Sequence, residues 1–264
     1  MKKFAKSLLA AGALAIGALS HAAPVTTWDV EVIGSWTNFA PDPGVSLSGD
    51  GLTLSWGSSS PQSSLAITNP AVTSANTYFG GGTPPASFIA PSVSLTHANN
   101  PIFPPSLTSA ELSVAVNLTP TNPAAAGFPL PTIAYNIAFA ETTNSTPCAV
   151  TSPTPCNDIF VLLGGFLNES FVYDGFTYFI NAFPTEGGAL GTLTDAGCAA
   201  AGVAAGCFGF TTPENASTNL AFGLTISTDP LQVPEPGSLA LIGLALAGIS
   251  VVRRRRSSVG AAVV

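Results

Sequence analysis

The sequence predicts an all-β fold, an antiparallel β-sandwich or jelly-roll-like domain, with a hydrophobic helix before it and another after it. Short runs alternate apolar and polar residues with a period of two, as half-buried strands do. The segments between these runs are rich in turn-forming residues, since the 264 residues include 26 Gly and 23 Pro. Outside the two ends, no window carries a convincing apolar stripe of helical period.

The first helix is expected to be a signal peptide at residues 1–22. Three lysines among the first six residues precede an apolar run from Leu8 to Leu19. Ser20 and Ala22 then supply the small residues that favour cleavage after Ala22. The run is too short to span a bilayer. We therefore expect the Sec machinery and signal peptidase to act on the chain.

Residues 23–232 are expected to form one exported, acidic, β-rich domain. The runs that alternate with a period of two are Leu47–Trp56, Leu112–Leu118, Ile133–Phe139, Phe176–Ile180 and Leu220–Ile226. The first of these is broken by Gly49-Asp50-Gly51, a turn signal. Ile159–Leu163 is continuously apolar, which is typical of a strand buried on both faces.

The distribution of charge excludes several functions for this domain. All 7 Lys and Arg lie at the two ends of the chain, with none between Lys6 and Arg253. All 14 Asp and Glu lie between Asp29 and Glu235. Such a domain cannot neutralise a phosphate backbone, so it does not bind nucleic acid. It also lacks the Lys or Arg of most phosphoryl-transfer sites.

Catalytic motifs are missing from the sequence, and we expect no enzyme. Neither G-x-S-x-G nor H-E-x-x-H occurs. A Ser-His-Asp triad would have to use His97, and no local sequence singles out a serine for it. A carboxylate-based glycoside hydrolase stays open, because it needs only two acids.

The four cysteines are expected to form two disulfides, since their number is even and the chain is exported. Their spacings are too wide for a zinc knuckle. Three connectivities are possible. The local pairs Cys148–Cys156 and Cys198–Cys207 are the simplest, and each closes a loop of about ten residues.

Two ligand classes stay open beside an expectation of no cofactor. Oxygen-rich, turn-like contexts are compatible with a structural Ca²⁺ ion, and the acids in such contexts are Asp42, Asp50, Asp158 and Asp174. No EF-hand loop is present, and isolated acids more often serve turns and solubility. Exposed aromatic rings would instead suit a carbohydrate-binding module, and the candidates are Trp28, Trp36, Trp56, Tyr78 and Tyr173. Tryptophans in a β-sandwich are more often part of the core.

The second helix is expected within residues 233–257. Pro234-Glu235-Pro236 precede an apolar run of 15 residues, Ser238 to Val252, and then the four arginines Arg253–Arg256. As a helix this run is about 22 Å long, short of the roughly 30 Å hydrocarbon core. It is therefore a marginal membrane span with the arginines and a tail of residues 258–264 in the cytoplasm.

This order of features resembles the PEP-CTERM sorting signal. The resemblance implies that the signal consists of Pro234, Glu235, Pro236 and the arginines Arg253, Arg254, Arg255 and Arg256. It implies processing by exosortase, a membrane cysteine transpeptidase of Gram-negative bacteria that make exopolysaccharide. The precursor would be anchored in the inner membrane. The product would be a protein of the cell surface or extracellular matrix, with exopolysaccharide as a partner.

One further motif is Thr96-His97-Ala98-Asn99. Its residues allow His97 to be a metal ligand or general base, or else the anchor of a loop before Pro101, where strand pairing is broken. The segment resembles the THxN group of PEP-CTERM proteins, in which Thr96, His97 and Asn99 form the family motif. Ser55-Trp56-Gly57 and Gln62-Ser63-Ser64-Leu65 add to the match. The resemblance implies membership of a group and no mechanism.

Overall fold

The structure is a computed structural model that describes residues 23–80, 82–150, 152, 156–164, 166–185 and 190–231. The predicted signal peptide (1–22), sorting signal (233–257) and tail (258–264) therefore lie outside the described residues. Within the described ranges, no helix is both long enough and apolar enough to cross a membrane.

The described residues form mainly β-strands, so the all-β prediction is confirmed. The strands are β1 (Thr27–Ala40), β2 (Val45–Leu47), β3 (Thr53–Trp56), β4 (Ser63–Thr68), β5 (Thr73–Tyr78), β6 (Ala90–Asn99), β7 (Ser109–Asn122), β8 (Phe128–Pro129), β9 (Ile133–Ala140), β10 (Asp158–Leu163), β11 (Phe166–Tyr173), β12 (Phe176–Pro184), β13 (Gly191–Thr192), β14 (Phe208–Thr212) and β15 (Ala216–Ser227). A 3₁₀ turn, η1 (Ala86–Phe88), and a short helix, α1 (Asp195–Ala200), complete the set.

Hydrogen bonds join the strands in one continuous path, β13-β14-β10-β9-β7-β1-β5-β15-β6-β4-β3-β2, with β8 on β7 and the β11–β12 hairpin on β15. Strand β5 connects the two halves of this path. It is antiparallel to β1 and parallel to β15, where Ile226 pairs with Thr77. The sheet is therefore mixed, and this pair is the departure from the antiparallel expectation within the described strands.

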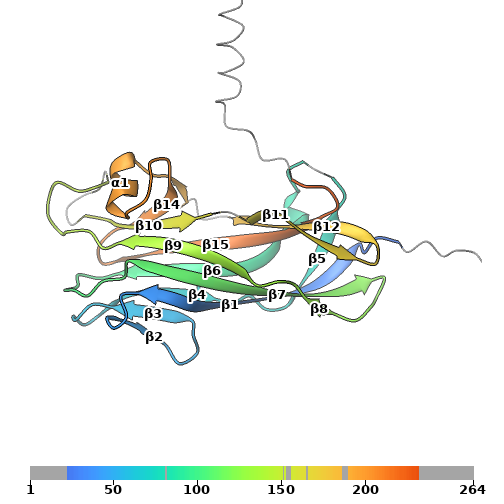
Figure 1. Cartoon of the computed structure of the whole chain (residues 1–264), viewed down its shortest axis with the longest axis horizontal. Coiled ribbons are helices and arrows are strands. Elements are labelled where there is room, and N and C mark those ends of the chain that lie inside the picture. Colours follow the sequence, from blue (N-terminus) through green and yellow to red (C-terminus); the bar gives the residue numbers. More distant parts are fainter. Residues whose placement is uncertain are drawn as a thin grey trace, which may run out of the picture.

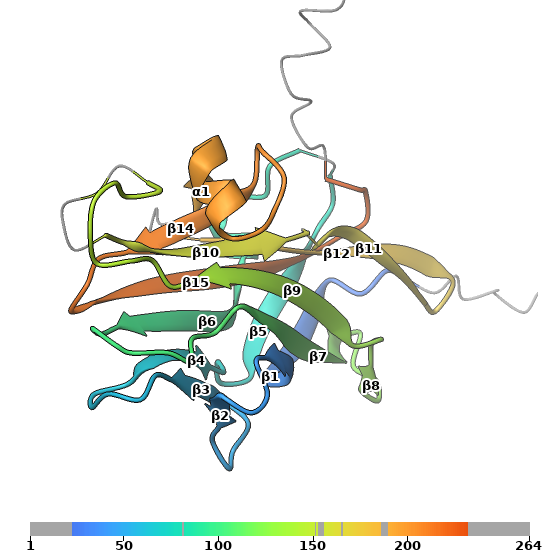
Figure 2. The same cartoon turned by 60° about the vertical axis from the view of Figure 1, so that its left-hand side comes forward.

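The two halves of the path lie face to face, as the layered view in Figure 2 shows. Contacts join strands that are far apart in the pairing order. Trp56 of β3 meets Phe139 of β9 with ring centroids 5.1 Å apart, and the side chain of Asn99 on β6 donates to the carbonyl of Thr212 on β14 over 3.0 Å. The space between the layers is filled by one large apolar core.

Period-two alternation places the apolar side chains in this core. Leu112, Val114, Val116 and Leu118 of β7 are all buried, as the sequence predicts. Strand β1, which the sequence analysis did not predict, buries Trp28, Val30, Val32 and Trp36 in the same way. The continuous run in β10 is buried on both faces over Ile159–Val161, because Phe160 joins the main core while Ile159 and Val161 join a second cluster. Leu163 at the end of the run is exposed.

Both predicted local disulfides are present, Cys148–Cys156 and Cys198–Cys207. The first holds the segment that leads into β10. The second joins α1 to the start of β14. Thr194 caps α1, since its Oγ1 accepts a hydrogen bond from Gly197 N over 3.1 Å. The second core cluster, formed by Ala138, Val150, Ile159 and Val161, includes residues from the first disulfide loop and from β9 and β10.

Candidate functional site

Several strands end together at one end of the molecule, at the left in Figure 1. Trp56 is the last residue of β3, His97 and Asn99 end β6, and Asp158 begins β10. Glu141 directly follows β9, and Glu214 lies in the turn between β14 and β15. The candidate site consists of the acids Glu141, Asp158 and Glu214, here called the acidic cluster, and of the side chains packed against it.

The inward alternation of the strands explains why polar groups meet here. On β10 the inward position before Phe160 is Asp158, and the position after Phe139 of β9 is Glu141. On β14 the residue after Phe210 on the same face is Thr212, which pairs directly with Asp158. On each of these strands the inward-facing side chains are apolar within the core, and the inward-facing side chain at this end of the core is polar.

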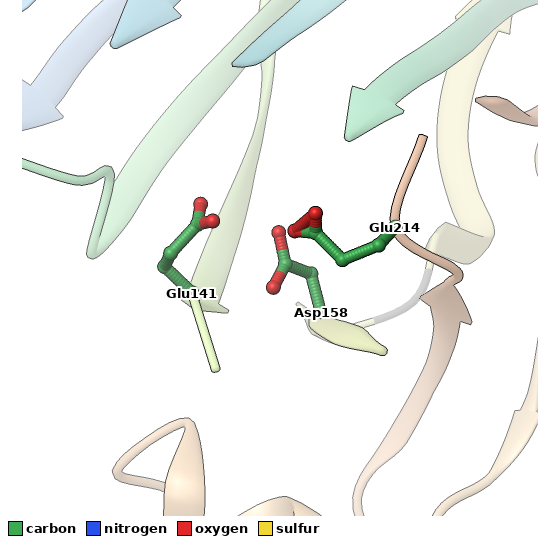
Figure 3. A group of neighbouring side chains, drawn as sticks. All are labelled: Glu141, Asp158 and Glu214. Carbon is green, nitrogen blue, oxygen red and sulfur yellow. The ribbon is translucent and has the colours of Figure 1, made fainter. Parts of the chain in front are cut away.

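Figure 3 shows the three carboxyl groups of the acidic cluster turned toward one another. One carboxylate oxygen from each residue lies within 4.8 Å of the other two. Asp158 is 1 % exposed, while Glu141 and Glu214 are half-buried. Between Lys6 and Arg253 the chain has no Lys or Arg. No lysine or arginine of this domain can therefore neutralise the cluster.

His97 lies on a strand and not in a loop, so the loop-anchor interpretation is wrong. It follows Val93 and Leu95 on the inner face of β6, where the next inward residue is Asn99. Its ring stacks on Trp56 at a centroid distance of 5.8 Å and meets Phe139 edge-on at 4.9 Å. The loop signal from Pro101 applies two residues after Asn99, where β6 ends.

The imidazole of His97 points to the acidic cluster. Its Nε2 lies 3.9 Å from Asp158 Oδ2, which is too long for a direct hydrogen bond. Neither ring nitrogen has a hydrogen-bond partner among the described residues. Burial lowers the pKa of His97 to about 3. The ring is therefore neutral at pH 7 and does not form an ion pair with Asp158.

Hydrogen bonds fix two of the acids. Trp56 Nε1 donates to Glu141 Oε2 over 3.0 Å, and the backbone N–H of Thr142 donates to Asp158 Oδ1 over 2.9 Å. Several buried oxygens nearby accept no hydrogen bond from a described donor, namely Asp158 Oδ2, Asn99 Oδ1 and Thr212 Oγ1. Acceptors without donors indicate a bound cation or bound water.

Burial and mutual repulsion shift the titration of the cluster. Burial raises the pKa of Asp158 to about 9, and the negative charge of Glu141 adds to the shift. Burial also raises the pKa of Glu141, against the hydrogen bond from Trp56. It raises the pKa of Glu214 as well, against the effect of the nearby Asn144 amide. Ionising all three acids without a counter-charge is therefore costly in this place, and in the absence of a cation Asp158 keeps its proton at pH 7.

The other candidate residues lie elsewhere. Asp50 accepts hydrogen bonds from Ser48 and Leu52 within its own turn, and Asp174 has a φ of 47° in the turn between β11 and β12. Asp42 is exposed before β2. Of the four aspartates considered for Ca²⁺, Asp158 is the one in the acidic cluster.

The aromatic candidates for carbohydrate stacking are mainly core residues. Trp28, Trp36 and Trp56 are at most 3 % exposed. Tyr173 is half-buried and stacks on Phe128 with centroids 5.0 Å apart. Thr96 faces away from the core, where its Oγ1 accepts a hydrogen bond from Asn219 over 2.9 Å.

Sequence reasoning did not find Glu141 or Glu214. Neither lies in a recognisable motif, since Glu141 stands in Phe-Ala-Glu-Thr and Glu214 in Thr-Pro-Glu-Asn. The available signal was the position of Glu141 in the alternation of β9, two residues after Phe139.

The sorting residues Pro234, Glu235, Pro236 and Arg253–Arg256 lie outside the described residues. Comparison with known families supplies the evidence for them. Residues 232–256 match the model of the PEP-CTERM protein-sorting motif. No curated protein matches the chain. A PEP-CTERM motif implies an exported protein with a C-terminal membrane-anchoring signal. This chain therefore carries a PEP-CTERM sorting signal and is consistent with an exosortase substrate.

Proposed function

We propose that this chain is a non-catalytic protein of the cell surface or extracellular matrix of an exopolysaccharide-producing Gram-negative bacterium. The observation that carries the proposal is the PEP-CTERM motif at residues 232–256, which directly follows the folded domain. A signal peptide at residues 1–22 would start export, and the apolar run before Arg253 would hold the precursor in the inner membrane. Exosortase would then process the chain near Pro234-Glu235-Pro236.

The end of the folded domain supports this presentation of the signal. The amide N–H of Leu231 donates to Asn168 Oδ1 over 2.6 Å, and Asn168 Nδ2 donates back to the Leu231 carbonyl over 3.1 Å. Leu231 is thus tied to β11 one residue before the family match begins. Pro234 and Pro236 favour extended backbone just beyond it. An anchored exit at Leu231 with two prolines in the sequence beyond it would suit presentation to a membrane-bound transpeptidase.

A carboxylate-based glycoside hydrolase is the second candidate, because the acidic cluster brings three acids together. Such an enzyme places two carboxyl groups on either side of a glycosidic bond, about 5 Å or more apart. Here Asp158 is buried and Glu141 is fixed by Trp56. These features favour a structural role for the cluster. We expect no release of reducing sugar from the producing strain's polysaccharide, and hydrolysis that is lost in Glu141→Gln would establish the enzyme instead.

Exopolysaccharide is the partner that the proposal implies. An acidic domain without Lys or Arg is repelled by an anionic polysaccharide, unless Ca²⁺ bridges the two. Cosedimentation of the exported protein with the polysaccharide, with and without calcium, tests this part. Absence of association under both conditions would remove the matrix role.

The mass of the exported protein tests the sorting step. We expect the protein from wild-type cells to begin at Ala23 and to end, or to carry an added mass, near Pro236. Cells without exosortase should retain the full tail. Peptide mapping needs an Asp- or Glu-directed protease, since trypsin has no site between Lys6 and Arg253. An intact tail in both strains would contradict exosortase processing.

A further inference from the structure

We propose that Glu141, Asp158 and Glu214 bind one Ca²⁺ ion at the end of the core where the two layers of the sheet meet. The site is separate from the sorting signal, and the inference does not depend on the proposed function.

The spacing of the acids fits a single calcium ion. Ca²⁺ binds oxygen at 2.3–2.6 Å, so two oxygens on the same ion lie at most about 5 Å apart. One oxygen each from Glu141, Asp158 and Glu214 meets this limit, because all three lie within 4.8 Å of one another. The side chains come from separate strand ends and converge on one point (Figure 3).

His97 is the independent observation that points to a ligand. Its side chain is 1 % exposed, and its Nε2 has no hydrogen-bond partner among the described residues. The nitrogen is aimed at Asp158 Oδ2 across 3.9 Å, and that oxygen also accepts no hydrogen bond from a described donor. A buried polar atom is normally satisfied. A cation on Asp158 whose bound water donates to His97 would satisfy both atoms.

The charge of the region favours a cation. Three carboxyl groups lie together in a domain with no Lys or Arg. Like charges so close together at the end of an apolar core repel strongly. A divalent cation removes this repulsion and links the ends of three neighbouring strands. Glu141 follows β9, Asp158 begins β10 and Glu214 follows β14, from which the chain crosses to β15 in the other half of the strand path.

The donor atoms favour calcium over other divalent metals. The acids contribute carboxylate oxygens, and Asn99 Oδ1 and Thr212 Oγ1 are further buried oxygens without donors beside them. Hard oxygen ligands suit Ca²⁺, which accepts 6–8 of them in flexible geometry. Zn²⁺ prefers nitrogen and sulfur donors. Mg²⁺ keeps several waters and demands near-octahedral geometry.

The test uses the full chain in mild detergent, with disulfides intact and metal removed by EDTA and dialysis. Calorimetric titration with CaCl₂ should give one site per chain. The Tm should rise by about 5–10 °C when Ca²⁺ exceeds its Kd by about 100-fold. Tryptophan fluorescence should change in parallel, because Trp56 Nε1 contacts Glu141.

Glu214→Gln is the informative variant, since Glu214 is half-buried in a turn and its loss leaves the strands intact. We expect its Ca²⁺ affinity to fall at least about tenfold. In EDTA its Tm should exceed that of the wild type, because one repelling charge is gone. Glu169→Gln, an exposed acid on β11, is the matched control and should change neither quantity. This reversal of sign between EDTA and Ca²⁺ distinguishes a ligand from a merely structural acid.

Three results would overturn the inference. The first is the absence of a saturable calcium titration. The second is an equal rise in Tm with Mg²⁺ and Ca²⁺ that persists in Glu214→Gln, which indicates general screening. The third is tighter binding of Zn²⁺ or Mn²⁺ than of Ca²⁺. None of these experiments involves exosortase, so their failure leaves the sorting proposal untouched.

Discussion

Trp56 connects the apolar core to the acidic cluster through a single side chain. It stacks on His97, meets Phe139 edge-on and donates from Nε1 to Glu141. The next residue, Gly57, has a φ of +95°, which L side chains rarely adopt. A Cβ at this position would also lie 2.7 Å from the Cβ of Ile102. Glycine therefore permits the close turn that fixes Trp56.

Gly57→Ala should destabilise the protein by two additive effects. The positive φ costs about 1 kcal/mol, and the contact with Ile102 adds about 1–3 kcal/mol of overpacking. Gly202→Ala is the matched control, since its φ is +73° and nothing lies within 4 Å of the added Cβ. Denaturant unfolding should show the larger loss for Gly57→Ala. Equal losses for the two variants would show that Ile102 plays no part.

At the scale of elements, the start of β10 is held by covalent and hydrogen bonds. Cys156, two residues before Asp158, is fully buried and bonded to Cys148. The hydroxyl of Thr142 lies in hydrogen-bond distance of two carbonyl oxygens, 3.0 Å from that of Cys156 and 3.1 Å from that of Asn157. The backbone N–H of Thr142 donates to Asp158 Oδ1. The segment after β9 and the segment before β10 thus hold Glu141 and Asp158 in register.

Removal of either disulfide should lower the free energy of unfolding by a similar amount, but only removal of the first should weaken the binding of Ca²⁺. The two bonds join cysteines 8 and 9 residues apart. A loop of this length gives a stabilisation of about 2.5 kcal/mol in the chain-entropy model. Cys148→Ala/Cys156→Ala should also weaken Ca²⁺ binding, because it frees the segment that positions Asp158. Cys198→Ala/Cys207→Ala is the control. The two double variants are compared by Tm and by calcium titration, and equal calcium affinities would contradict this positional role.

At the scale of the whole molecule, the domain is acidic throughout. The chain has 14 Asp and Glu, and the 7 Lys and Arg all lie near its ends. Repulsion among these acids opposes the compact state, and it is weakened when salt screens the charges. The same repulsion keeps the domain away from anionic polymers unless a divalent cation is present.

The Tm of the full chain in EDTA should therefore rise by a few degrees between about 10 and 200 mM salt, since the Debye length falls from roughly 30 Å to below 10 Å. Sodium and potassium chloride should give the same rise, because screening depends on ionic strength. Thermal unfolding followed by circular dichroism measures it. A Tm that stays constant or falls with salt would show that charge repulsion is not a main destabilising force.

Much of the fold follows from local pattern. The alternation in Leu112–Leu118 and Leu220–Ile226 predicts the strands and their buried faces, because a β-strand turns every second side chain to the same side. Strand β1 escaped prediction although its burial alternates equally well, since its apolar positions are mixed with Gly34 and polar residues. The sorting motif is also a local feature, as its recognised residues are contiguous in sequence.

The sequence by itself determined the all-β class and the sorting signal and favoured the local cysteine pairing, because each depends on residues close together in the chain. The tertiary structure decided the acidic cluster. Glu141, Asp158 and Glu214 are separated by 17 and 56 positions and meet only because β9 and β14 end, and β10 begins, at the same edge of the sheet, where the three strands are neighbours. It also moved His97 from an expected loop into the core. Long-range strand pairing sets both outcomes, and no local spacing in the sequence encodes it.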